Sequence, residues 1–146
     1  SVNFIISLFD STYAKYAYHS SGSMLIFYEK ILKSVLNQKN WGLLIKPKSY
    51  SLDQLPYREN IQGVIERLER HGRCVRLDGA NTRVSFAASA GDVTICYGTN
   101  SAGIIAALVG KKVLHWDLPG CLEHPLYYLG GENKVVFKSN EEPVLV

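Results

Sequence analysis

The sequence predicts an α/β protein with a doubly wound, mostly parallel sheet. Two observations support this prediction. Short, almost continuous apolar runs alternate with segments whose apolar residues recur at helical spacing, and glycine-containing or polar turns separate them. Regular alternation of strands and helices with right-handed crossovers produces an open parallel sheet that carries helices on both faces.

Six apolar runs have the length and composition of buried strands. Runs without polar alternation are typical of a parallel sheet whose two faces are both covered. The expected strands are residues 2–9, 42–45, 74–77, 93–97, 112–116 and 134–137.

Three segments carry an apolar stripe at the spacing of one helix face. In the first, Ser23 is placed to cap the amino terminus. Gly72 and Gly110 are placed to end the second and third. A shorter helix is expected over residues 83–90. The three stripes are Met24, Phe27, Tyr28, Ile31, Leu32 and Val35; Ile61, Val64, Ile65 and Leu68; and Ala102, Ile105, Ala106 and Val109.

The expected order of elements is βαβαβ(α)βαβ, then a loop and a last strand, as in a Rossmann-like domain. With a spatial strand order of 3-2-1-4-5, the strands 2–9 and 93–97 are neighbours where the order reverses. Ligands of such sheets bind beyond the carboxyl ends of the strands at this switch point. The loops after these two strands are therefore the first candidates for functional residues.

The composition limits the classes of function. The chain has 146 residues, of which 47% are hydrophobic and 20% charged, as in one ordinary globular domain. No apolar run approaches the roughly 18 to 20 residues of a membrane helix. Sixteen Lys and Arg against thirteen Asp and Glu give a net charge of +3, and the basic residues are scattered. No nucleic-acid partner is expected.

The cysteines and the start of the chain bear on its cellular location and on whether it is part of a longer protein. Cys74, Cys96 and Cys121 form no C-x-x-C pair, so neither a disulfide framework nor a zinc knuckle is expected. Reduced thiols favour a cytoplasmic location. The first residue is Ser1 and core-like residues follow almost at once. We expect residues 1–146 to be one domain of a longer chain; the alternative is a small protein with a processed first residue.

The loop after the strand 93–97 is the strongest candidate for a ligand site. Glycine lets the backbone adopt positive φ and approach a ligand closely. The free N–H groups and the dipole of a helix amino terminus attract phosphate. The alternative is that Thr99 or Ser101 only caps the helix, and the loop by itself does not decide between the two. The candidate ligand residues are Gly98, Thr99, Asn100, Ser101, Ala102 and Gly103.

The loop after the first strand, residues 10–23, is long, polar and aromatic. Long loops in compact domains are often functional. Its last residues precede a helix and would face the 98–103 loop across the switch point, although they also fit a solvated connection with capping serines. The candidate residues are Ser20, Ser21, Gly22 and Ser23.

Other strand ends carry further candidates. Lys46 either meets a phosphate or is a solvated lysine, and Asp78-Gly79 fits a plain turn better than a sugar contact. After the strand 112–116, Asp117 or Glu123 is placed to contact a sugar hydroxyl. The histidines and carboxylates there match no standard ligand spacing, so no metal is expected. No catalytic residue is assigned.

Residues 92–114 resemble the signature of the carboxyl-terminal domain of GT-B glycosyltransferases. They comprise an Asp-led strand, a Gly/Ser/Thr turn, an Ala-rich helix, then Gly-Lys and the next strand. Similar stretches occur in nucleotide-sugar 2-epimerases and in transferases of capsule and teichoic-acid type. Residues 9–12 and 44–48 are similar to segments of bacterial surface-polysaccharide enzymes.

The resemblance implies a site for a nucleotide-sugar or CDP-alcohol donor, bound as a substrate without a further cofactor. The turn 98–103 would hold the diphosphate through backbone N–H groups and the Thr99 and Ser101 hydroxyls, while Lys46 would offset phosphate charge. In many relatives a Glu in the following helix grips the ribose. Ile104-Ile105 stands there in this chain, which leaves Asp117 or Glu123 as substitutes.

In GT-B enzymes the acceptor, and often the catalytic base, belong to the amino-terminal half. The expectation is therefore a cytoplasmic donor domain, inactive alone, whose partners are a nucleotide-sugar and the amino-terminal domain of its parent chain. The parent is a candidate for binding the inner membrane face. Two alternatives stay open: half of a nucleotide-sugar 2-epimerase, or a non-catalytic module that binds a nucleotide or a protein.

Overall fold

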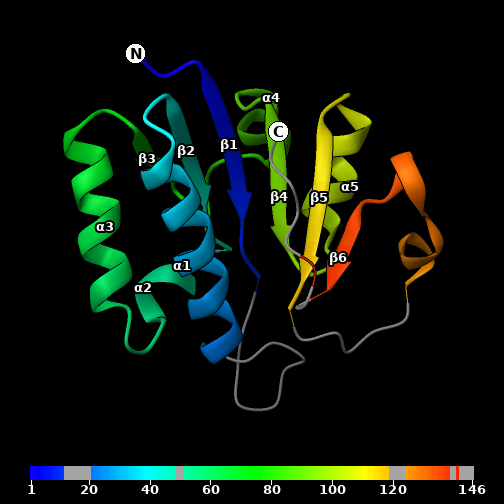
Figure 1. Cartoon of the computed structure of the whole chain (residues 1–146), viewed down its shortest axis with the longest axis horizontal. Helices are drawn as coiled ribbons and strands as arrows, with labels where there is room; N and C mark the ends of the chain where they lie inside the picture. Colours follow the sequence, from blue (N-terminus) through cyan, green and yellow to red (C-terminus); the bar gives the residue numbers. More distant parts are fainter. Residues whose placement is uncertain (12–20, 49–50, 119–123, 139–140, 142–146) are drawn as a thin grey trace.

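The computed structural model describes residues 1–11, 21–48, 51–118, 124–138 and 141. Its centre is a six-stranded sheet in which every neighbouring pair is parallel and the strand order is β3-β2-β1-β4-β5-β6. Figure 1 shows helices in front of and behind this sheet. The predicted doubly wound α/β class and the 3-2-1-4-5 order are therefore confirmed.

All six predicted strands are present, with shifted ends at some of them. β1 begins at Phe4, two residues later than predicted, because its first register partner is Trp41, the first residue of β2. The last strand is shifted because Lys134 closes a turn by donating to the Gly131 carbonyl. The strands are β1 Phe4–Phe9, β2 Trp41–Lys46, β3 Cys74–Arg76, β4 Val93–Tyr97, β5 Lys112–Asp117 and β6 Val136–Lys138.

The predicted helices are also present, and their glycine stops are confirmed. Gly72 and Gly110 follow the second and third predicted helices with φ of 66° and 80°. The cap assigned to Ser23 is wrong, because the first helix already begins at Ser21. A short helix, α2, was not predicted. The helices are α1 Ser21–Asn37, α2 Ser51–Gln54, α3 Glu59–Arg70, α4 Val84–Ser89, α5 Ser101–Leu108, and the 3-10 turns η1 Pro125–Tyr128 and η2 Gly131–Asn133.

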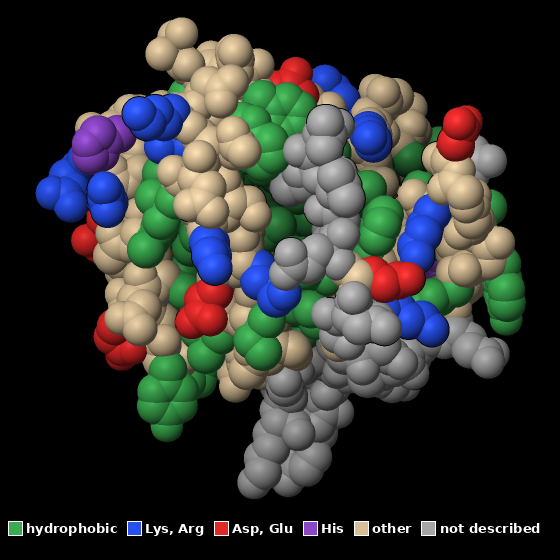
Figure 2. Space-filling model, viewed as in Figure 1, with side chains coloured by type: hydrophobic (Ala, Val, Ile, Leu, Met, Phe, Trp, Pro, Cys, Tyr) green, Lys and Arg blue, Asp and Glu red, His purple; other side chains and the backbone are tan. Residues whose placement is uncertain are grey.

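The two faces of the sheet are covered by different kinds of helix. On one face α1 and α3 bury their apolar stripes over the main core, and Figure 2 shows Lys, Arg and acidic side chains on their outer side. On the other face α4 and α5 contain no charged residue. Phe86 and Leu108 are 67% and 81% exposed there. Among the described helices, none has the length and hydropathy that a membrane crossing requires.

Burial should make Cys74 and Cys96 unreactive in the native protein. Burial raises the pKa of Cys74 to about 12 and also raises the pKa of Cys96, so little reactive thiolate forms at pH 8. We expect iodoacetamide to leave both thiols unmodified in the native protein and to alkylate both in guanidinium chloride. Mass spectrometry of the peptides measures this, and equal labelling in the two states would contradict it.

Candidate functional site

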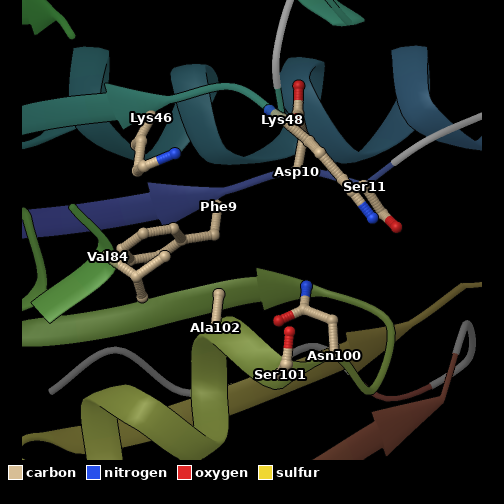
Figure 3. Close-up of a pocket in the computed structure, with 9 residues that line it drawn as sticks. All are labelled: Phe9, Asp10, Ser11, Lys46, Lys48, Val84, Asn100, Ser101 and Ala102. Carbon is tan, nitrogen blue, oxygen red and sulfur yellow. The ribbon is translucent and has the colours of Figure 1, made fainter. Parts of the chain in front are cut away.

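A cavity of about 130 Å³ lies at the carboxyl ends of β1 and β2, beside the start of α5 (Figure 3). It adjoins the switch point, because β1 and β4 are neighbours there. The chain leaves β1 for α1 on one face and leaves β4 for α5 on the other. The cavity is lined by Phe9, Asp10, Ser11, Lys46, Lys48, Val84, Asn100, Ser101 and Ala102.

The amino terminus of α5 forms one wall of the cavity. Asn100 caps this helix: its Oδ1 accepts from the Gly103 N–H at 3.1 Å, and its Nδ2 donates to the Tyr97 carbonyl at 3.3 Å. Neither Thr99 nor Ser101 is therefore the cap. The first N–H groups of a helix have no acceptor within the helix. The Asn100 cap satisfies one of them, which leaves those of Ser101 and Ala102 for a ligand.

The two glycines of the 98–103 turn have different roles. Gly98 has a φ of 65°, as predicted for a tight turn, and its N–H donates to the Trp116 carbonyl at 2.8 Å. Gly103 instead packs on a buried histidine: an added Cβ would lie 2.2 Å from His115 Cε1. Gly103 is thus required by packing inside the protein. His115 Nδ1 lies 3.1 Å from the Gly98 carbonyl, and burial lowers the pKa of His115.

Lys46 contributes a buried cation to the opposite wall. It is only 8% exposed, and its Nζ donates to the Gly79 carbonyl at 2.8 Å. Burial lowers the pKa of Lys46, while the charges of Asp10 and Asp78 act in the opposite direction. Lys46 is therefore not a solvated lysine. Asp78 accepts from the N–H groups of Ala80 and Asn81, which confirms the predicted turn.

Lys48 and Ser11 lie at the outer part of the cavity. Figure 3 shows the Lys48 side chain running past Ser11, on the side of the cavity opposite Asn100 and Ser101. An anion between these two walls would meet an ammonium group on one side and a helix amino terminus on the other. Both groups attract negative charge.

Asp10 is the acidic residue among those that line the cavity, and it is 5% exposed. Its Oδ2 accepts from the Tyr28 hydroxyl at 2.7 Å. Its Oδ1 accepts from the backbone N–H of Lys48 at 2.6 Å. Asp10 thus links β1, α1 and the chain that leaves β2.

The structure brings together some of the predicted site residues. Lys46, Asn100, Ser101 and Ala102 line one cavity. The other described candidates do not line this cavity. Gly98 and Gly103 shape the turn that contains Thr99. Asp117 is buried at the end of β5. Ser21, Gly22 and Ser23 form the first turn of α1, where Ser23 Oγ lies 2.5 Å from the Tyr97 hydroxyl. Ser20 and Glu123 lie outside the described residues.

Three polar residues of the cavity were not among the predicted site residues: Asp10, Ser11 and Lys48. The sequence does contain a signal for them. Asp10 and Ser11 directly follow a buried strand, and Lys48 follows the neighbouring strand by two residues. Phe9 and Lys46 are register partners, so the residues after them emerge at the same level of the sheet.

The fold and the cavity define a doubly wound, Rossmann-like α/β protein whose switch point adjoins a cavity lined by both apolar and charged side chains. Comparisons with protein-family models, curated proteins and solved structures found no match for this chain. Within the described residues, no group of three or more His, Cys, Asp or Glu is arranged to hold a metal ion.

Proposed function

We propose that the chain is the nucleotide-sugar donor-binding domain of a glycosyltransferase-like enzyme of surface-polysaccharide synthesis. The observation that carries the proposal is one cavity with Lys46 and Lys48 on one side and the amino terminus of α5 on the other. The cavity is suited to a phosphate group, and the resemblance of residues 92–114 to the GT-B donor domain suggests that this phosphate belongs to a nucleotide-sugar.

In the proposed complex, the donor diphosphate lies between the two walls. The N–H groups of Ser101 and Ala102, together with the Ser101 hydroxyl, bind phosphate oxygens, because the helix dipole and free N–H groups favour an anion there. Lys48 contacts the same group from the opposite side. Lys46 offsets the negative charge that grows on the diphosphate as the glycosidic bond breaks, which is a large contribution to catalysis in general.

Recognition of the ribose must differ from the pattern expected for relatives. The helix position where a Glu grips the ribose is occupied by Ile104-Ile105, and α5 has no acidic residue in its first turn. An epimerase would need carboxylates as proton donors and acceptors. Both oxygens of Asp10 already accept hydrogen bonds, which favours a donor-binding role over that alternative.

The test is titration calorimetry with UDP, CDP, GDP and CMP. We expect at least one to bind with a Kd in the mM range or tighter. Lys48→Ala should weaken binding about tenfold because it removes a charge-assisted contact. Ser101→Trp should abolish binding because the side chain fills the cavity beside the helix terminus.

Lys39→Ala is the matched control, since it removes the same charge from an exposed lysine in the turn before β2. Its affinity should equal that of the wild type. Absence of binding for all four nucleotides would contradict the proposal and favour a non-catalytic module that binds a protein. Unchanged affinity in Ser101→Trp would place the phosphate elsewhere.

A further inference from the structure

A carboxylate in the wall of an anion site needs a physical reason. Asp10 lines the same cavity as Lys46 and Lys48, and its negative charge opposes the binding of an anion. Lys46 partly offsets that charge, since the two groups interact electrostatically. A side chain that only filled space would not need the charge, so the role of Asp10 lies in the hydrogen bonds that its carboxylate accepts.

The hydrogen bond from Lys48 to Asp10 replaces one that the sheet does not supply. β1 and β2 pair up to Phe9 and Lys46, and the next residue of the second strand is Pro47, which has no backbone N–H. The following N–H, that of Lys48, donates to Asp10 Oδ1 at 2.6 Å. Asp10 therefore holds the chain at the residue where β2 has ended.

The other oxygen of Asp10 fixes the carboxylate itself. The Tyr28 hydroxyl donates to Oδ2 at 2.7 Å, and Tyr28 is fully buried on the core-facing side of α1. The backbone of Lys48 is thereby tied to the core through one side chain. Because this backbone is held in place, the Lys48 side chain begins at the edge of the cavity, opposite Asn100 and Ser101 (Figure 3).

We infer that Asp10 is the positioning residue of the anion site: it acts through the Lys48 backbone and sets where the Lys48 ammonium group meets a bound phosphate. The inference rests on the proposed function, because it needs the cavity to bind phosphate. It adds a division of roles in which Lys48 contacts the anion and Asp10 determines its position.

The test is a double-mutant cycle with inorganic pyrophosphate as the probe, measured by titration calorimetry. Asp10→Ala and Lys48→Ala should each weaken binding about tenfold. The double variant Asp10→Ala/Lys48→Ala should bind pyrophosphate no more weakly than either single variant. The reason is that the effects of substituting two residues are not additive when one acts through the other. Asp10→Asn should bind at least as tightly as the wild type, since its amide oxygen accepts the Lys48 N–H, its NH2 group donates to the Tyr28 hydroxyl oxygen, and the opposing charge is gone.

Asp92→Ala is the matched control. Asp92 is an exposed carboxylate whose Oδ2 accepts from a strand N–H, that of Ile5, at 2.7 Å and at the opposite end of the sheet. Its loss should lower stability without changing pyrophosphate affinity. Weakening in Asp92→Ala equal to that in Asp10→Ala would reduce the role of Asp10 to general stability and overturn the inference.

The remaining outcomes separate this inference from the proposed function. A wild-type protein that binds no pyrophosphate and no nucleotide overturns the proposed function, and this inference with it. A wild type that binds, with an additive loss of about a hundredfold in the double variant, overturns the inference alone. If Asp10→Ala does not fold, Asp10→Asn takes its place in the test. A tenfold loss of pyrophosphate affinity in Asp10→Asn contradicts the inference, because that variant still accepts the hydrogen bond from the Lys48 N–H.

Discussion

Gly103→Ala is expected to lower the free energy of unfolding by about 1–3 kcal/mol or more, because the added methyl group overpacks a closed site. The new Cβ would lie 2.2 Å from Cε1 and 2.7 Å from Nε2 of His115. The ring has little room to move, since His115 is 2% exposed and its Nδ1 lies within hydrogen-bond distance of the Gly98 carbonyl. The start of α5 must shift instead. Urea unfolding followed by circular dichroism measures the change.

Gly63→Ala is the matched control for this steric effect. Gly63 lies inside α3, and an added Cβ would meet no atom within 4 Å. Alanine is favoured over glycine in a helix interior by about 0.5–1 kcal/mol, so this variant should be more stable than the wild type. Equal destabilisation of the two variants would show that contact with His115 does not account for the effect at Gly103.

Phe27→Ala is expected to lower the free energy of unfolding by about 3–5 kcal/mol, as is typical for an aromatic side chain removed from a core. Phe27 is 0% exposed on α1, and its ring lies 5.2 Å from that of Tyr97 and 6.3 Å from that of Trp116, both in edge contact. A domain of this size has a total stability of about 5–15 kcal/mol. The loss is therefore a large part of the whole, and thermal unfolding should begin well below that of the wild type.

Phe86→Ala removes the same side chain from an exposed position. Phe86 lies on α4 and is 67% exposed, so its removal should change the free energy of unfolding by no more than about 0.5 kcal/mol. Both variants can be compared in one urea series. A large loss in Phe86→Ala, or a small one in Phe27→Ala, would contradict the burial described for the two faces of the sheet.

The sequence predicted the strands well because a parallel sheet covered on both faces requires unbroken apolar runs. β4 was predicted with both ends correct, since Asp92 and Gly98 flank an uncharged, mostly apolar run. The start of α1 was wrong because an apolar stripe marks the buried face, whereas the first turn of a helix need not contain an apolar residue. The stripe begins at Met24, three residues after Ser21.

The candidate site could be predicted only where its determinants are local. The turn 98–103 carries its signal in neighbouring residues, so the turn and the helix that follows it were predicted. The requirement for glycine at position 103 could not be predicted, because it comes from contact with the His115 ring on the next strand. The role of Asp10 was not visible either, because its partner Lys48 is 38 positions away and is reached only through the strand register.

The strand order also determines when the cavity can exist while the chain folds. β1, β2 and β3, with α1 and α3 between them, all precede residue 77 and can pair as soon as they have been synthesised. β1 meets β4 only through residues far apart: Ile5 and Asp92 are 87 positions from each other. Such distant pairing is slow because closing a long loop costs entropy before the new contacts can compensate for it. We therefore expect the wall that carries Asp10, Lys46 and Lys48 to form early, and the α5 wall to close the cavity in a late step of folding.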